Sequence, residues 1–346
     1  MHGSDSLPGM KVGVVGASGY TGAELVRLCS GHPSLEVAWA TGDSQAGSGV
    51  GELYPSLAAA HAKMTFEHFQ PWMVAAVDLV FLAMPHGRSQ VVVKDIWDLH
   101  VPIVDLSADF RLRDPVAHER WYGTVHQAPE LLGNFVYGLP ERHRVDIVKA
   151  RAVAAAGCYP TAATLALAPL VDAGMIQTEG VIVDAASGVS GAGRGAKAAT
   201  SFSTANEDFV AYGLLDHRHT PEMEQAIGAQ LLFTPHLAPM TRGILATCYA
   251  RPSGATSTQA LMDLLSSVYS DEPFVVVGHR PPSTKATWGS NAMHLTARFD
   301  ERTGWVVVLA ALDNLGKGAA GQAVQCANLM LGLEETAGLS ALGVYP

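Results

Sequence analysis

Short apolar runs alternate with segments of helical periodicity through the first half of the chain. The apolar runs predict strands over residues 11–15, 35–41, 78–84, 101–106 and 151–156. The segment after the first run predicts a helix over residues 23–29, with Gly31 placed to end it. Strands that alternate with helices are typical of a parallel sheet covered on both faces.

The second half of the chain has more strands and fewer helices. Its strand patterns cover residues 181–187, 243–250, 274–278, 292–299 and 305–312. Two helices are expected to start near Thr220 and Ser257, and a long apolar helix is expected after Gly318. Many strands with few helices indicate an α+β domain with a mixed sheet.

Composition and charge narrow the class of protein. The chain has 346 residues, 48% of them hydrophobic and 16% charged, which is enough apolar sequence for two buried cores. Lys and Arg total 22 against 32 Asp and Glu, and the formal charge of -10 argues against binding to nucleic acids or anionic membranes. The uncharged stretch 152–171 contains Gly157, Pro160 and Pro169, so it predicts a strand, a turn and a buried helix rather than a membrane span.

The four cysteines, Cys29, Cys158, Cys248 and Cys326, lie far apart without CxxC spacing. This arrangement argues against a zinc cage or a secreted disulfide framework and suits a reducing compartment. The first ten residues have no apolar signal core, and we expect a loose extension there. Together these features predict a soluble, cytoplasmic protein.

A glycine-rich turn follows the first predicted strand and opens the first helix. Glycines there permit a tight turn and the close approach of a pyrophosphate, whose charge the helix N-terminus stabilises. We assign cofactor binding to Gly16, Ser18, Gly19, Tyr20, Thr21 and Gly22. The second strand is followed by Asp43, which would favour a free ribose 2′-hydroxyl, and by Ser44, which would favour a 2′-phosphate. Because no Arg or Lys lies between residues 28 and 62, these residues alone leave NAD and NADP open.

Cys158 lies at the predicted start of a helix, in the sequence Gly-Cys-Tyr-Pro that begins at Gly157. Proline favours the first helical turn, so the thiol is expected at the helix N-terminus. The helix dipole and the N–H groups there stabilise a thiolate and lower the pKa of the thiol. We therefore predict that Cys158 is a nucleophile and that the other three cysteines are inert core residues.

A polar motif, His-Arg-His-Thr-Pro-Glu, starts at His217 and precedes the next helix, for which Thr220 is the expected cap. Its two histidines could act as acid–base partners for a nucleophile or lie solvated on a loop. A metal site lacks a third ligand motif nearby, so none is predicted.

Further polar residues could hold anionic groups. The glycine-rich turn that ends in Arg194 is typical of an anion nest. Asn314, after the last strand, could bind a nicotinamide amide or cap the final helix. The substrate candidates are Arg111, Arg113, Ser190, Arg194, His219 and Glu222, and the additional cofactor candidates are Ser187, Gly188 and Asn314.

At these motifs the chain resembles the N-acetyl-γ-glutamyl-phosphate reductases of arginine biosynthesis. GASGYTG, DLSADFRL, YGLPE, AGCYPTA, SGVSGAGR, HRHTPE, FTPHL, RGILAT and NLGKGAAGQAVQ appear in that family's order over nearly all of residues 10–346. The resemblance implies NADPH as cofactor, Cys158 as the thiol nucleophile and His217 as the acid–base group. It also implies a Rossmann-like domain joined to an α+β domain like the C-terminal domain of glyceraldehyde-3-phosphate dehydrogenase, and a homodimer or homotetramer. Many members carry a basic residue where this chain has TGDSQAG, which leaves the strictness of the NADPH preference open.

We therefore expect a dinucleotide-binding domain over residues 10–157, a catalytic and oligomerisation domain over 158–317, and a C-terminal helix over 318–346 that packs back on the first domain. The predicted reaction is the NADPH-dependent reduction of N-acetyl-γ-glutamyl phosphate to N-acetylglutamate semialdehyde and phosphate through a cysteine thioester. Two alternatives stay open. One is another semialdehyde dehydrogenase of the same fold, of the aspartate-semialdehyde type, and the other is a dinucleotide-sensing binding protein without turnover.

Overall fold

The computed structural model describes residues 9–346, and over these residues the chain divides into two compact units. The first unit contains the chain up to Pro115, together with His126–Ala155 and Ala320–Leu339. The second unit contains Val116–Val125, Ala156–Ala319 and Ser340–Pro346. Residues 1–8 of the expected N-terminal extension lie outside the described residues.

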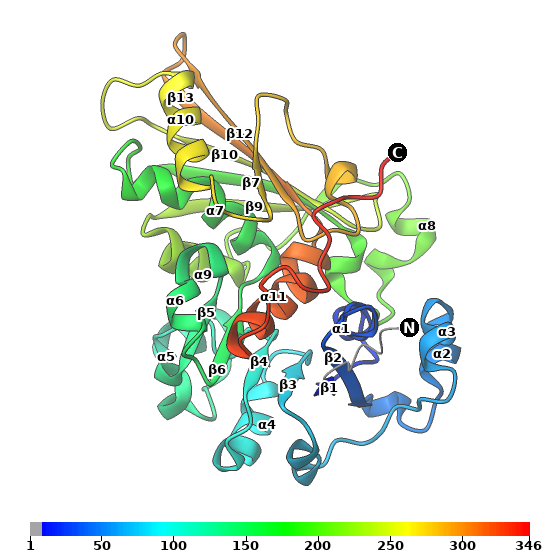
Figure 1. Cartoon of the computed structure of the whole chain (residues 1–346). Coiled ribbons are helices and arrows are strands. Elements are labelled where there is room, and N and C mark those ends of the chain that lie inside the picture. Colours follow the sequence, from blue (N-terminus) through cyan, green and yellow to red (C-terminus); the bar gives the residue numbers. More distant parts are fainter. Residues whose placement is uncertain (1–8) are drawn as a thin grey trace, which may run out of the picture. The chain divides into compact units, whose positions relative to one another are not determined.

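A parallel sheet forms the centre of the first unit (Figure 1), with the strand order β2-β1-β3-β4-β6-β5 in the described residues. The strands are β1 (Met10–Val15), β2 (Leu35–Ala40), β3 (Leu79–Leu82), β4 (Ile103–Asp105), β5 (Phe135–Gly138) and β6 (Ala152–Ala155). Every residue of β3, β4 and β6 is buried, as expected for strands covered on both faces. The predicted parallel sheet is therefore confirmed, although the sequence pattern did not reveal β5.

Helices from distant parts of the sequence complete the first unit. They are α1 (Tyr20–Ser30), α2 (Val50–Leu53), α3 (Ala58–His61), α4 (Ser89–Ile96), α6 (Pro140–Ile147) and α11 (Gly321–Met330). As predicted, α1 ends immediately before Gly31, whose N–H donates to the carbonyl oxygen of Leu28. Helix α11 contacts α1, α6, β4 and β6, and its Ala323 and Val324 are fully buried in the same core as Val12.

A mixed sheet forms the centre of the second unit, with the order β11-β12-β13-β10-β7-β9-β8 in the part of the chain that the structure describes. Its strands are β7 (Val181–Gly188), β8 (Val210–Ala211), β9 (Leu231–Ala238), β10 (Ile244–Ala250), β11 (Val275–Val277), β12 (Met293–Asp300) and β13 (Trp305–Leu312). Parallel pairing of β7 with β9 and antiparallel pairing of β7 with β10 confirm the predicted mixed sheet. Strands β8 and β9 were not predicted.

Helices cover one face of the mixed sheet. They are α7 (Cys158–Asp172), α9 (His219–Ile227) and α10 (Thr258–Val268), while α5 (Pro115–Tyr122) and α8 (Phe202–Ala205) are shorter peripheral helices. Helix α7 is buried over most of its length and contacts β10, β13, α9 and α10. Along β7 and β10 every second residue is only partly buried, which marks the sheet face opposite α7 as the less covered one.

Candidate active site

The turn between β1 and α1 has the geometry of a phosphate-binding loop. Gly16 has φ +82°, and a Cβ there would lie 2.5 Å from the carbonyl oxygen of Ala83. A Cβ at Gly22 would lie 2.4 Å from the carbonyl oxygen of Gly16, so both positions require glycine. Gly19 is the N-cap of α1, and an added Cβ there would meet the Gly16 oxygen at an ordinary 3.6 Å. The backbone N–H groups of the first turn of α1 therefore border room that a pyrophosphate fits.

The other assigned residues of this turn lie around the same helix start. The carbonyl oxygen of Ser18 accepts a hydrogen bond from the hydroxyl of Tyr54 at 2.8 Å, which ties the turn to the short helices that follow β2. Tyr20 is exposed and Thr21 is partly exposed in the first turn of α1. The residues that the sequence assigned to the cofactor thus lie together around the start of α1.

Ser44 lies exposed in a 3-10 turn, Asp43–Gln45, just after β2. The guanidinium of Arg88 lies 3.9 Å from the Asp43 carboxylate, so a cation does stand beside this turn although none lies near it in sequence. Arg88 comes from the segment between β3 and α4, and sequence reasoning missed it. The strand order could have revealed Arg88. Strands β2 and β3 both flank β1, and the carboxyl ends of parallel strands meet at one edge of the sheet, so the loops after β2 and β3 are expected to lie close together.

The two predicted arginines after β4 have different surroundings. Arg111 is only 7% exposed, and its Nη2 donates to the carbonyl oxygen of Leu106 at 2.8 Å. Arg113 is exposed. Of the two, Arg113 is therefore the more accessible to an anion in the unit described.

Cys158 is the first residue of α7, as predicted, and Gly157 is the N-cap. The thiol is partly exposed, whereas Cys29, Cys248 and Cys326 are buried. Burial raises the pKa of Cys29 to about 12, and burial together with Asp184 raises that of Cys248 to about 12. Among the cysteines, Cys158 alone combines solvent access with a helix N-terminus.

Glu222 anchors the backbone immediately before Cys158. Its side chain is fully buried, and its Oε1 accepts a hydrogen bond from the Gly157 N–H at 2.8 Å. The Thr161 hydroxyl donates to the carbonyl oxygen of Gly157 at 2.9 Å. These bonds hold the start of α7 from two sides.

An aromatic cluster brings both predicted histidines beside the residue that follows Cys158. The Tyr159 ring lies 5.7 Å from the His217 ring and 6.0 Å from the His219 ring, centroid to centroid. The two imidazoles are 4.9 Å apart, and Phe233 packs edge-on against both Tyr159 and His217. The two predicted histidines thus lie together in the second unit, packed around the residue that follows Cys158.

The protonation state of His217 follows from its surroundings. Its Nδ1 accepts the backbone N–H of His219 at 3.1 Å, so the ring hydrogen of the neutral form is on Nε2. Burial, and next the nearby Arg218, lowers the pKa of His217 to about 4. His217 is therefore a neutral donor at Nε2 near pH 7.

One local prediction in this motif is wrong. Helix α9 begins at His219 with Arg218 as its N-cap residue, so Thr220 is inside the first turn and is not the cap. The chain enters the helix early because the His217 ring accepts the His219 N–H, as a capping side chain does.

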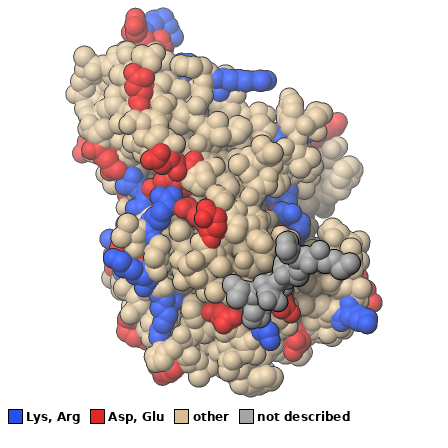
Figure 2. Space-filling model, in the orientation of Figure 1, with Lys and Arg blue, Asp and Glu red and all other residues tan. Residues whose placement is uncertain are grey.

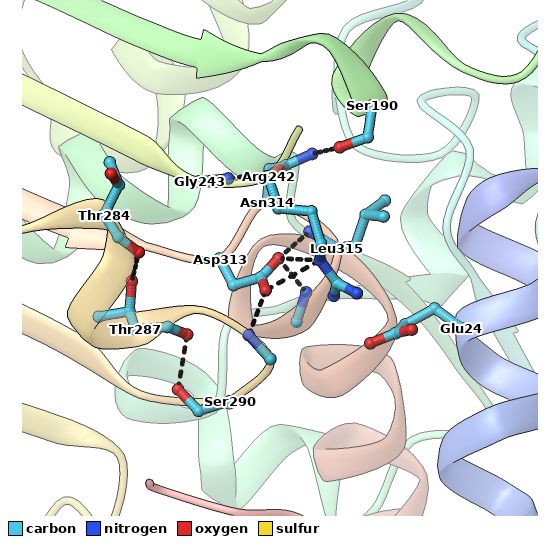
Figure 3. A network of polar contacts seen from close by, with 12 residues as sticks. Glu24, Ser190, Arg242, Gly243, Thr284, Thr287, Ser290, Asp313, Asn314 and Leu315 are labelled. Atoms are coloured by element: carbon cyan, nitrogen blue, oxygen red, sulfur yellow. Dashed lines mark hydrogen bonds and ion pairs between the residues drawn. The ribbon is translucent and has the colours of Figure 1, made fainter. Parts of the chain in front are cut away.

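Two more of the predicted residues, Ser190 and Asn314, belong to a polar network near the ends of β7 and β13 (Figure 3). The Asn314 side chain accepts the Gly243 N–H at 2.7 Å and donates to the Ser190 hydroxyl at 3.0 Å. Ser187 is buried, and a Cβ at Gly188 would lie 2.7 Å from the Thr241 backbone. Asn314 therefore joins the turn that starts at Ser187 to the segment before β10.

Arg194 is partly exposed, beyond this network. Among the described residues no group of three or more metal-ligating side chains is found. Figure 2 shows acidic and basic side chains interspersed on the displayed face rather than one continuous basic area. No helix in the described part of the chain is long and apolar enough to cross a membrane.

Comparison with known proteins agrees with this architecture. Residues 11–150 match the model of the semialdehyde dehydrogenase NAD-binding domain, and residues 158–314 match that of the semialdehyde dehydrogenase dimerisation domain. Two crystal structures of aspartate semialdehyde dehydrogenases share the fold. The Vibrio cholerae enzyme II in complex with ASA has a TM-score of 0.69 and 15% identity, covering 94% of this chain and 99% of that one. The Candida albicans enzyme with NADP has a TM-score of 0.68 and 14% identity, covering 93% and 98%.

The chain belongs to the semialdehyde dehydrogenase family, whose two domain models together match most of its length. It is an oxidoreductase with an NAD(P)-binding domain of that family. Its relatives within the family are N-acetyl-gamma-glutamyl-phosphate reductases. Those of Symbiobacterium thermophilum and Desulforudis audaxviator are both 47% identical to it, over 97% of this chain and 99% and 100% of theirs.

Proposed function

We propose that this protein reduces N-acetyl-γ-glutamyl phosphate to N-acetylglutamate semialdehyde and phosphate, with NADPH as reductant and a thioester on Cys158 as intermediate. The observation that carries the proposal is the contrast among the cysteines. Cys158 is partly exposed at a helix N-terminus, and the next residue, Tyr159, packs against both histidines, while the other three cysteines are buried in cores. The names of the 44–47% identical relatives supply the substrate.

The first chemical step belongs to Cys158. Its thiolate attacks the γ-acyl carbon, the sulfur–carbon bond forms, and the bond from that carbon to the phosphate oxygen breaks. The N-terminus of α7 stabilises the thiolate through its N–H groups and dipole. Covalent capture divides one difficult reduction into two easier steps.

The bound cofactor supplies the hydride that reduces the acyl group. In that step His217 donates a hydrogen bond from Nε2 to the acyl oxygen and stabilises the negative charge that develops there. The fixed tautomer of His217 suits this role, because Nδ1 is held by the His219 N–H. When the carbonyl re-forms, the carbon–sulfur bond breaks, which releases the aldehyde and the Cys158 thiolate. His219, in the first turn of α9, contacts the substrate, and Glu222 holds the Gly157 backbone.

The preference for NADPH is proposed to come from two residues near the end of β2. Ser44 would donate to the 2′-phosphate, and Arg88 would pair with it in place of Asp43. The pyrophosphate would lie over Gly19 at the start of α1, and Asn314 would face the nicotinamide amide. The structure of a fold relative with NADP is consistent with this choice.

The substrate's carboxylate and phosphate need cations. Arg113 and Arg194 are accessible, whereas Arg111 is largely buried and already hydrogen-bonded to Leu106. We therefore assign Arg111 the smaller part in substrate binding.

The proposed function divides the chain into two regions. Residues 10–157 would bind the cofactor and 158–317 would carry catalysis. The match of 158–314 to a dimerisation domain supports a homodimer or homotetramer, joined through the less covered face of the mixed sheet. The cytoplasm is proposed as its location.

The test is the reverse reaction, followed by nicotinamide absorbance. The protein is supplied with phosphate, NADP or NAD, and either N-acetylglutamate semialdehyde or aspartate semialdehyde. The proposal expects kcat/KM at least about 100-fold higher for N-acetylglutamate semialdehyde than for aspartate semialdehyde. The active site would have polar groups that pair with the N-acetyl group, and the shorter aspartate semialdehyde would leave them unpaired. A preference for aspartate semialdehyde would favour the aspartate-type alternative. Binding of NADPH without turnover of either substrate would favour a sensing protein.

A further inference from the structure

The turn that follows β13 packs directly against the nucleophile. This turn, η9 (Gly316–Ala320), is a single π-helical turn, a conformation that is frequent at functional sites. A Cβ added to Gly318 would lie 2.9 Å from the Cys158 Cβ, closer than two such atoms come in real proteins. The backbone of the turn therefore forms one wall of the Cys158 side chain, and only glycine leaves room for it.

The turn is also packed closely against a second neighbour, the backbone of Ser290. A Cβ added to Gly316 would lie 2.1 Å from the carbonyl oxygen of Ser290. The Gly318 N–H is itself bonded to the Asp313 carbonyl oxygen at 2.9 Å. The close packing of Gly316 and the hydrogen bond of Gly318 thus fix where the Gly318 backbone lies.

The Asp313 carboxylate is the anchor of this segment, as Figure 3 shows. It is fully buried and accepts the N–H groups of Gly289, Leu315 and Gly316 at 2.6, 2.9 and 3.2 Å. The Arg242 guanidinium, 3.0 Å away, balances its charge. A buried carboxylate with this many donors resists displacement, because every bond would have to be replaced.

The backbone immediately before Cys158 is also held in place. The Gly157 N–H is bonded to the buried Glu222 carboxylate at 2.8 Å, so the first residue of α7 cannot easily shift away from Gly318. A side chain at position 318 would then be accommodated by displacing the Cys158 side chain or by unwinding the start of α7. Either change removes the thiol from the N–H groups that stabilise its thiolate.

We propose that Gly318, held in place by Asp313, is a positioning residue for the Cys158 thiolate. The inference rests on the proposed function in one respect, the assignment of Cys158 as the nucleophile. It predicts a loss of thiol reactivity in the absence of any substrate, so its outcome is separate from the identity of the substrate.

The experiment compares Gly318→Ala with Gly278→Ala, a control in the same unit where an added Cβ meets nothing within 4 Å. Each protein is treated with iodoacetamide across a range of pH, and the rate at Cys158 is followed by peptide mass spectrometry. In Gly318→Ala the rate near neutral pH should fall at least ~10-fold and its midpoint should move to higher pH, as expected when a thiolate leaves a helix N-terminus. Gly278→Ala should match the unchanged protein. An unchanged rate and midpoint in Gly318→Ala would overturn the proposal.

A double-mutant cycle with Cys158→Gly covers the case in which Gly318→Ala folds poorly. The thermal midpoint should fall on changing Gly318 to Ala when Cys158 is present, and much less when residue 158 has no Cβ. Recovery of the folded state in the Cys158→Gly background supports the contact. An equal loss in both backgrounds shows that Gly318 acts elsewhere and refutes the proposal.

Discussion

The carboxyl group of Asp105 should carry a proton in the folded protein, and the hydrogen bonds around it give the reason. The Ser89 hydroxyl lies 3.1 Å from Asp105, 3.0 Å from Asp109 and close to the Ser107 hydroxyl, which lies 2.8 Å from Asp105. These are four oxygen–oxygen contacts, but the hydroxyl groups of Ser89 and Ser107 supply only two hydrogens for them. A proton on Asp105 supplies a third hydrogen, donated to Ser89, which then donates to Asp109.

Asp109 is the hydrogen-bond acceptor of this pair. It accepts the N–H groups of Gly87 and Gln90 at 2.7 and 3.1 Å as well as the Ser89 hydroxyl. The carbonyl oxygen of the same residue is bonded to the His126 ring, and the Arg111 cation also acts on Asp105. Complete burial, and next the charge of Asp109, raises the pKa of Asp105 from 3.8 to about 7.

The free-energy cost of ionising Asp105 follows from the difference between its folded and unfolded pKa values. One pKa unit corresponds to about 1.4 kcal/mol, so ionising Asp105 in the folded state costs roughly 4 kcal/mol more than in the unfolded chain. The folded-state pKa is raised, so the stability that Asp105 contributes is complete below about pH 4 and is lost as the pH rises to about 7. Asparagine at this position stays neutral and can still donate to Ser89. Asp105→Asn should therefore remove the loss of stability that wild type shows as the pH rises.

The assay is chemical unfolding of the wild-type protein, Asp105→Asn and Asp109→Asn between about pH 4 and pH 8. Relative to wild type, the free energy of unfolding of Asp105→Asn should rise with pH, by up to roughly 4 kcal/mol over this range. Asp109→Asn, which replaces one of the two acceptor oxygens by a donor, should be destabilised by about 1–3 kcal/mol. Parallel pH curves for wild type and Asp105→Asn would refute the bound proton.

Three further predictions concern the cofactor and the histidines. Gly19→Val should weaken binding of both NADPH and NADH, measured by fluorescence titration, because a branched side chain fills the room over the first turn of α1; unchanged affinity would count against the pyrophosphate position. Arg88→Ala should lower kcat/KM for NADPH by about 10–100-fold with little effect on NADH, and equal losses for the two would exclude a 2′-phosphate contact. His217→Asn should lower kcat by ~10²–10⁴-fold and remove the decrease of kcat at acidic pH, because protonation of His217 near pH 4 breaks the bond at Nδ1. His219→Asn should mainly raise KM for the acyl phosphate, and the opposite pattern would exchange the roles of the two histidines.

The sequence predicted those parts of the fold whose signals are local. The glycine turn after β1 and the helix start at Cys158 depend on neighbouring residues, through backbone space and first-turn preferences. Strand β9 was missed because Pro235 interrupts its pattern. The strand continues through the proline, whose carbonyl oxygen accepts the Tyr212 N–H at 3.0 Å.

Features that depend on tertiary contacts escaped the sequence. Arg88 is 45 positions from Asp43, and only the parallel strand order brings their loops to one edge. The wall that Gly318 forms against Cys158 joins residues 160 positions apart. A glycine in a predicted turn has many explanations, and only the structure reveals which atom its missing Cβ would meet.

The central claim is that Cys158 accepts the acyl group, and intact-protein mass spectrometry tests it most directly. The protein is mixed with N-acetyl-γ-glutamyl phosphate in the absence of any nicotinamide cofactor, quenched in acid, and mapped by peptide. The account predicts one acyl adduct per chain, located on Cys158, which disappears when NADPH is added and never forms in Cys158→Ser. Turnover with no adduct on Cys158, or with substantial activity retained in Cys158→Ser, would contradict it.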